Sequence, residues 1–96
     1  MIRSFKDGGT EAVYHGEPAR LVRQYPADVL RIAVRKLDML NAATRLDDLA
    51  SPPGNRLEAL RGDRKRHHSI RVNDQWRIVF RWDGNDALLV ELCDYH

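Results

Sequence analysis

Three side chains that can exchange protons occupy the last three positions of the sequence, Asp94, Tyr95 and His96. They follow an apolar segment, residues 88–93, whose composition is typical of a buried strand. Carboxylate, phenol and imidazole groups are among those that transfer protons in catalysis. A strand paired with its neighbours would hold these groups in place, whereas a frayed end would not. We therefore interpret the group as a candidate catalytic site, with a solvated tail as the alternative.

Positive charge is concentrated between Arg56 and Arg77. This window contains seven basic and three acidic residues, so it carries +4 in a chain whose formal net charge is +2. Such a cluster is typical of a surface that binds phosphate groups, and a solvated basic loop would have the same composition. Its basic members are Arg56, Arg61, Arg64, Lys65, Arg66, Arg71 and Arg77.

Composition restricts the classes of protein that fit. The chain has 96 residues, 43% of them apolar, which predicts a single domain spanning residues 1–96 with one core. The sequence contains neither an apolar run of the ~20 residues needed to cross a bilayer nor a signal-peptide pattern at its start. A lone cysteine, Cys93, excludes an internal disulfide, and the four histidines lack the spacing of metal ligands. We expect a cytoplasmic protein without metal, other cofactor or membrane partner.

The first half of the chain has the pattern of helices. A short strand is expected at residues 2–5, followed by a short helix with Thr10 as its N-cap. The clearest helix is residues 28–43, where apolar side chains recur at three- and four-residue steps. The segment 50–55, with two prolines and a glycine, is a loop. The apolar side chains that should face the core are Leu30, Ala33, Leu37 and Leu40.

The second half has the pattern of strands, at residues 68–72, 75–82 and 87–95. From Trp76 to Trp82 every even position is large and apolar, which is the period of a half-buried antiparallel strand. A three-residue loop or a bulge near Asn73 would place Arg71 on the same side of the sheet as Arg77. These segments predict an α+β fold, a small antiparallel sheet packed against N-terminal helices.

The same alternation divides the sheet into two different faces. One face should be the core and should include Leu88, Val90 and Leu92 from the last strand. The opposite face should not be part of the core. It would collect Arg71, Arg77, Arg81, Glu91 and Tyr95.

Several separated motifs give the chain a resemblance to a known family. The stretch "NRLEALRGDRKRHHSIRVNDQWRIVFRW" and the ending "VELCDYH" strongly resemble the HigB toxins, the plasmid maintenance system killer protein family within the RelE/ParE toxin superfamily. The segments "MIRSFKD", "RKLDMLNAAT" and "SPPGNRLEAL" fit the same family, so the likeness covers essentially the whole chain. The resemblance implies a compact α+β fold, ribosome-dependent cleavage of messenger RNA, and neutralisation by a cognate HigA-type antitoxin with a helix-turn-helix domain.

The resemblance also implies roles for individual residues. Asp94–His96 matches the catalytic group at the end of the family's sequences, and Arg77 in "QWRI" matches an arginine that contacts the scissile phosphate. Arg61 falls where relatives have a basic catalytic residue. Glu58 occupies a position that is histidine or glutamate in different relatives. Arg71 in "SIR" matches a basic position of the family.

Residues of these types could cleave RNA without a metal. RNA carries its own nucleophile, the 2′-hydroxyl, so cleavage requires a base, an acid for the leaving 5′ oxygen, and positive charge near the phosphate. Glu58 is a candidate base and His96 a candidate acid. Arg61 and Arg77 carry permanent charge and forked donors that match phosphate oxygens.

The remaining candidates would support that chemistry. Tyr95 could stack on a nucleotide or bond the phosphate, and Asp94 could position a neighbour. The doubled His67-His68 departs from the family's usual glycine-aromatic sequence, and neither histidine is assigned a role. The RNA-binding residues would be Arg56, Arg64, Lys65, Arg66 and Arg71.

Other functions fit parts of the pattern. A ParE-like toxin that inhibits DNA gyrase by binding would not need Glu58, Arg61 or the terminal group. A basic RNA-binding module without catalysis would explain the +4 window and leave the terminal group unused. Structural roles are also open, because Arg77 could pair across the sheet with Glu91.

Overall fold

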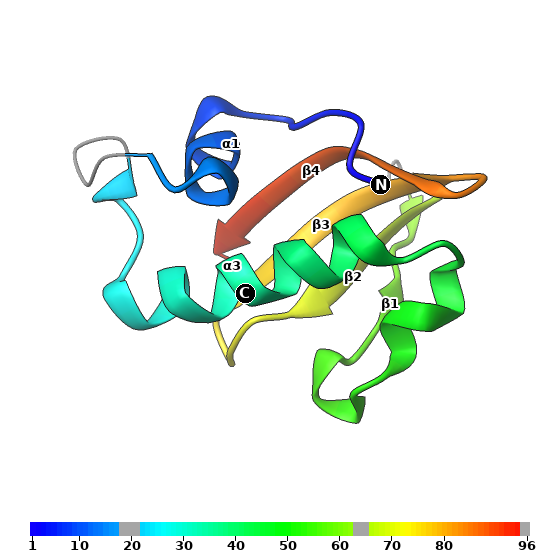
Figure 1. Ribbon diagram of the computed structural model, residues 1–96. Helices are drawn as coiled ribbons and strands as arrows, with labels where there is room; N and C mark the ends of the chain where they lie inside the picture. Colours follow the sequence, from blue (N-terminus) through cyan, green and yellow to red (C-terminus); the bar gives the residue numbers. More distant parts are fainter. Residues whose placement is uncertain (18–21, 63–65, 95–96) are drawn as a thin grey trace.

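The computed structural model describes residues 1–17, 22–62 and 66–94. Its strands form one antiparallel sheet in the order β1-β2-β3-β4, and α3 lies across one face of that sheet (Figure 1). The α+β prediction is confirmed. The elements are the helices α1 (Gly8–His15) and α3 (Ala27–Ala42), the 3₁₀ turns η1 (Leu46–Ala50) and η2 (Pro53–Asn55), and the strands β1 (Glu58–Ala59), β2 (His67–Arg71), β3 (Trp76–Asp83) and β4 (Asp86–Asp94).

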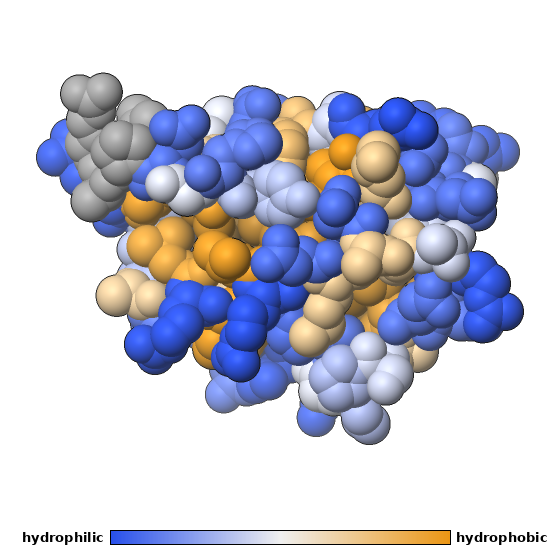
Figure 2. All heavy atoms as spheres, in the orientation of Figure 1, coloured by the Kyte–Doolittle hydropathy of each residue, from blue (hydrophilic) through white to orange (hydrophobic). Residues whose placement is uncertain are grey.

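Helix α3 carries the largest share of the helical core. Its buried side chains are Val29, Ala33, Leu37 and Leu40, which pack in one cluster with side chains of β3 and β4. Three of the four expected core residues are buried, and the fourth, Leu30, is half-buried and packs against the same core. Val29, which was not expected there, is also buried. Leu30 also lines a hollow of about 190 Å³ between α1 and α3. Apolar side chains reach the surface there (Figure 2).

The cap of α1 differs from the expectation. Asp7, not Thr10, is the N-cap, and its Oδ1 accepts from the backbone N of Thr10 at 2.7 Å. Thr10 is fully buried, and its Oγ1 accepts from the backbone N of Leu92 at 2.9 Å. Thr10 therefore satisfies a buried donor of β4, a role that local sequence rules do not reveal.

The N-terminal segment covers the free edge of β4. The expected strand at residues 2–5 is present only as two isolated parallel bridges, Ile2 with Ala87 and Phe5 with Val90. Backbone bonds join them, including Lys6 N to Val90 O at 2.9 Å. An unpaired strand edge is a site for unwanted pairing, and this segment covers it.

The turn between β2 and β3 has the register that the side-chain pattern requires. Arg71 lies opposite Arg77 and Ile70 opposite Ile78. Backbone N atoms of Val72 and Asn73 both donate to Trp76 O, which closes a three-residue loop at residues 73–75. The predicted loop length and the shared side of Arg71 and Arg77 are confirmed.

A β-bulge changes the parity of the last strand. Val79 pairs with Glu91 but Arg81 pairs with Leu88, so β4 has one extra residue between these pairs. Leu89 has φ 53° and is 43% exposed. Val90 and Leu92 face the core as expected, but Leu88 does not, because the bulge reverses the alternation before Val90.

The Thr10 contact predicts a stability effect. Thr10→Val keeps the shape of the side chain but leaves the N–H of Leu92 without its acceptor. We expect the free energy of unfolding to fall by about 1–3 kcal/mol in urea denaturation. Thr10→Ser keeps the hydroxyl and should cost about 0.8 kcal/mol, the value of one buried methyl. Equal stability of the valine variant and the native protein would contradict this role.

Candidate active site on the outer face of the sheet

The face of the sheet turned away from α3 carries most of the polar side chains singled out in the sequence, and we call it the outer face. The strand register orders it in three rows, each crossing neighbouring strands. The middle row begins at Glu58 on β1 and ends at Glu91 on β4. The rows are Arg71–Arg77–Cys93, Glu58–Ser69–Val79–Glu91 and His67–Arg81–Leu88.

Arg77 is buried at the centre of this face, with 8% of its surface exposed. Its Nε donates to Ser69 Oγ at 2.8 Å, and its Nη2 donates to Arg56 O at 2.6 Å and Ser69 O at 3.3 Å. Ser69 is fully buried and Val79 nearly so. The outer face is therefore partly covered, because the segment that carries Arg56 contacts Arg77.

Glu58 is the acidic partner of Arg77. Its Oε1 lies 3.9 Å from Nη2 of Arg77, and 55% of the carboxylate side chain is exposed. Glu91, the other acidic partner considered for Arg77, lies opposite Val79 and forms an ion pair with Lys6 at 3.6 Å. Glu58 therefore combines a fixed position beside a cation with access from solvent.

The loop that delivers Glu58 is held from two sides. Asn55 is fully buried, and its Nδ2 donates to Leu49 O at 3.1 Å and Ser51 O at 3.3 Å. Its Oδ1 accepts from Nζ of Lys36 on α3, and burial lowers the pKa of Lys36, with smaller effects from two nearby arginines. The next residue, Arg56, offers its carbonyl to Arg77. The loop therefore bridges α3 and β3 immediately before β1.

The other basic candidates lie around this centre. Arg71 pairs with Asp74 of the neighbouring loop, and Arg56, Arg61 and Arg66 are exposed. Arg64 and Lys65 lie outside the described residues. The described structure thus brings Glu58 and Arg77 together and leaves Arg56, Arg61 and Arg66 exposed to solvent.

The candidate group at the end of the sequence is described only in its first member. Asp94 ends β4 opposite Trp76, and its Oδ2 accepts from Nε2 of Gln75 at 2.8 Å. Tyr95 and His96 lie outside the described residues. Because Cys93 pairs with Arg77, the described part of β4 ends one residue beyond the central arginine.

Two side chains that contribute to the outer face were missed by sequence reasoning. Ser69 has no local signal in the sequence, because its contact with Arg77 depends on the pairing of β2 with β3. Lys6 is brought to Glu91 by the edge segment. The doubled histidines separate: His67 faces outward, whereas His68 stacks on Phe80 with ring centroids 6.2 Å apart.

In residues 1–17, 22–62 and 66–94, no cluster of three histidine, cysteine, aspartate or glutamate side chains could hold a metal ion. The helices described in these ranges are too short or too polar to span a membrane.

Comparison with known proteins gives consistent matches. The family model for the RelE-like toxin of the type II toxin-antitoxin system HigB matches residues 3–96. Toxin HigB-1 of Vibrio cholerae is 41% identical over 88 residues, which covers 92% of this chain and 90% of the relative. Endoribonuclease HigB of Proteus vulgaris is 35% identical over 101 aligned positions, with full coverage of both.

Solved structures share the fold at low sequence identity. YoeB in the YoeB-YefM complex of Staphylococcus aureus has a TM-score of 0.62 at 16% identity, covering 100% of this chain and 98% of that one. The YoeB/ParE toxin of Agrobacterium tumefaciens has a TM-score of 0.51 at 19% identity, with 98% of each chain covered. These likenesses establish the architecture alone.

The burial of Arg77 predicts that it contributes to stability. Arg77→Lys retains the charge, but a single ammonium cannot reproduce the forked contacts to Ser69 and Arg56. We expect the free energy of unfolding to fall by about 1–3 kcal/mol in urea denaturation. Arg71→Lys is the matched control and should change it by less than about 1 kcal/mol, because its partner Asp74 is exposed. Equal losses in both variants would refute a special structural role for Arg77.

Proposed function

The chain belongs to the family of HigB-like toxins, the RelE-like toxins of type II toxin-antitoxin systems, and we propose that it is an endoribonuclease that cleaves messenger RNA on the ribosome. The name of its Proteus vulgaris relative, Endoribonuclease HigB, supports the activity. The observation that carries the proposal is the exposed carboxylate of Glu58 beside the buried guanidinium of Arg77. A general base next to a fixed positive charge suits attack on a phosphate by the RNA's own hydroxyl.

The proposed reaction needs only groups of this chain and the RNA. Glu58 takes the proton of the 2′-hydroxyl, and the 2′ oxygen attacks the adjacent phosphorus. The bond from phosphorus to the 5′ oxygen breaks, and that oxygen takes a proton from His96. The products are a 2′,3′-cyclic phosphate on one fragment and a 5′-hydroxyl on the other.

Positive charge stabilises the crowded phosphate during this step. Arg77 supplies a permanent charge from a low-dielectric position, where its effect on a nearby anion is larger than in water. Arg61 is exposed three positions after Glu58 and approaches the phosphate from the rim. Tyr95 orients a nucleotide and Asp94 positions its neighbours. These two residues therefore position the reacting groups and transfer no proton.

The rim arginines hold the RNA backbone. Phosphate contacts contribute most of the affinity of such surfaces and position the strand without reading its bases. The same proposal gives the protein its partners, which are the ribosome with its messenger in the cytoplasm and a HigA-type helix-turn-helix antitoxin. The RNA-binding residues are Arg56, Arg64, Lys65, Arg66 and Arg71.

Mapping of transcript ends tests the activity directly. The protein is induced in bacteria, and new 5′ ends are mapped on translated and untranslated transcripts. New ends confined to translated transcripts would support cleavage on the ribosome. Intact transcripts together with stalled replication would instead favour a ParE-like inhibitor of DNA gyrase and reject the proposal.

The identity of the nucleophile gives a sharp prediction for the substrate. A single 2′-deoxy substitution at the nucleotide whose 2′ oxygen attacks should abolish cutting at that bond, because the nucleophile is gone. The same substitution at a distant nucleotide is the control and should leave cutting unchanged. The fragments are followed on sequencing gels in reactions with the ribosome. Cleavage of the substituted bond would show that another nucleophile is used.

The proposed acid and base predict matched losses of rate. His96→Ala and Glu58→Gln should each lower the cleavage rate by ~10²–10⁴-fold, the usual contribution of a positioned general acid or base. His15→Ala, on α1, is the control and should retain the native rate. Circular dichroism and thermal melting verify the fold of each variant. A His96→Ala protein that cleaves at the native rate would remove His96 from the mechanism.

A further inference from the structure

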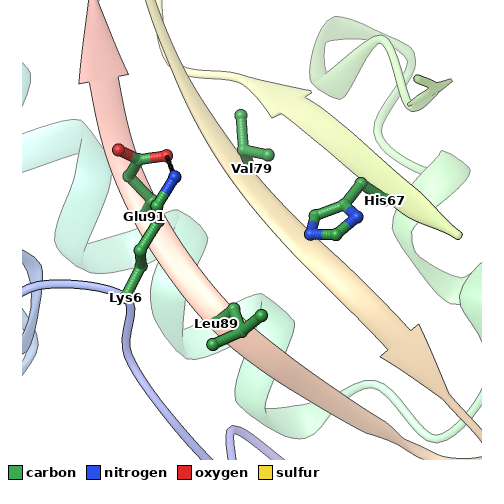
Figure 3. A pocket seen from close by; sticks show the side chains of 5 residues that line it. All are labelled: Lys6, His67, Val79, Leu89 and Glu91. Carbon is green, nitrogen blue, oxygen red and sulfur yellow. Dashed lines mark ion pairs between the residues drawn. The ribbon is translucent and has the colours of Figure 1, made fainter. Parts of the chain in front are cut away.

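A second feature of the outer face lies beside the Glu58–Arg77 pair. It is a hollow of about 120 Å³ lined by Lys6, His67, Val79, Leu89 and Glu91, which we call the Val79 pocket (Figure 3). Val79 and Glu91 belong to the same row of the outer face as Glu58. None of the proposed steps of cleavage uses this hollow.

The floor and one wall of the Val79 pocket are apolar. Val79 is 2% exposed on a face whose other central side chains are polar, and Leu89 is 43% exposed. The imidazole of His67 comes from β2 and lines the side opposite β4 (Figure 3). An enclosed cavity of ~150 Å³ holds one whole benzene ring, so this smaller hollow can take part of a single planar ring and leaves the rest in solvent.

The apolar wall is formed at a conformational cost. Leu89 is the extra residue of the bulge and has φ 53°, in the left-handed region that glycine and asparagine adopt far more readily than leucine. Ser4 Oγ accepts from the backbone N of Leu89 at 2.9 Å and fixes this conformation. A strained residue that exposes an apolar side chain beside a candidate site is a reason to look for a ligand.

The polar rim of the pocket offers both kinds of hydrogen-bonding group. Nζ of Lys6 lies 3.6 Å from Oε1 of Glu91, so an ammonium and a carboxylate stand side by side above the floor. Nucleobases carry both donors and acceptors on their edges, and this pair can meet both. A bare phosphate would not be matched by an apolar floor and a carboxylate.

Two arginines bracket the pocket along β3. Arg77 lies two residues before Val79 and Arg81 two residues after it, each about 7 Å away at the rise of a strand. Arg81 pairs with His67 and with Leu88, so it belongs to the outer face. A cation, an apolar hollow and a second cation therefore follow one another along the strand.

We propose that the Val79 pocket binds one nucleobase of the RNA, next to the bond that is cut. The RNA runs along β3 with its backbone phosphates near Arg77 and Arg81. The nucleobase between these phosphates turns into the pocket. Its ring packs on Val79, Leu89 and His67, and its edge bonds Glu91 and Lys6. The inference rests on the proposed function and extends it, because it gives the enzyme a determinant of base preference.

Two variants and a control test the pocket. Leu89→Asn keeps a residue that tolerates positive φ but removes the apolar wall, so its melting temperature should match or exceed that of the native protein. Glu91→Gln keeps the shape of the rim and removes the carboxylate. Val34→Asn changes another exposed apolar residue, on α3, the helix on the opposite face of the sheet.

Cleavage of a sequence-diverse transcript pool by each protein with ribosomes provides the measurement. Leu89→Asn should raise KM about tenfold, which corresponds to the binding contribution of one stacked base, and should change kcat little. Glu91→Gln should change the base distribution at one fixed position relative to the cut. Val34→Asn should resemble the native protein in both measurements.

The outcomes separate the two proposals. Native cleavage with unchanged KM and base distribution in both pocket variants would reject the nucleobase site and leave the endoribonuclease intact. Unchanged cleavage with weakened neutralisation by the antitoxin would identify the pocket as a protein contact instead. A native protein that cleaves no transcript would reject the proposed function and this inference with it.

Discussion

The hydrogen bonding of the Arg77 guanidinium is the interaction on which the outer face depends. A buried cation must keep its partners, because an unpaired charge in a low-dielectric interior is far more costly than a lost surface contact. Arg77 therefore ties together Ser69 on β2 and the carbonyl of Arg56, which precedes β1 by two residues. The position of Glu58 follows from these contacts, since the chain has little freedom between Arg56 and the strand that pairs with β2.

The edge of β4 provides a second constraint that reaches the same face. The N-terminal segment pairs with β4 to cover its edge, and in doing so it brings Ser4 to Leu89 and Lys6 to Glu91. Protection of the edge and formation of the Val79 pocket are consequences of one set of backbone contacts. Thr10 continues the same protection at Leu92, so α1 is attached to the strand that ends beside Arg77.

The outer face carries charges of both signs, which suits the proposed cleavage of a polyanion. Two carboxylates stand at the ends of the middle row, Glu58 and Glu91, and arginines occupy the rows on either side. A uniformly basic surface would bind RNA more strongly but would offer no proton acceptor. The mixture of charges lowers the general attraction for phosphate. In the proposed mechanism, the two carboxylates serve as the proton acceptor and as the group that recognises a nucleobase.

The sequence by itself determined the main helix, the three longer strands and the family. The even-position apolar residues of β3, the odd loop near Asn73 and the periodic helix that became α3 are local patterns, and the structure confirms each of them. Motifs spread along the whole chain identified the toxin family, and they marked Glu58, Arg61, Arg77 and Asp94 as candidates for the site. The structure brings two of these, Glu58 and Arg77, together. These features can be predicted from the sequence because side-chain periodicity and turn length depend on residues that are close together in the chain.

Only the tertiary structure decided how those residues work together. The burial of Arg77 depends on a carbonyl 21 positions away, and the role of Thr10 depends on a donor 82 positions away. The bulge at Leu89 reversed the expected orientation of Leu88, because register is set by pairing between strands and by the edge segment. No local pattern encodes such contacts, since the cost of a buried unpaired group is felt only once the chain has folded.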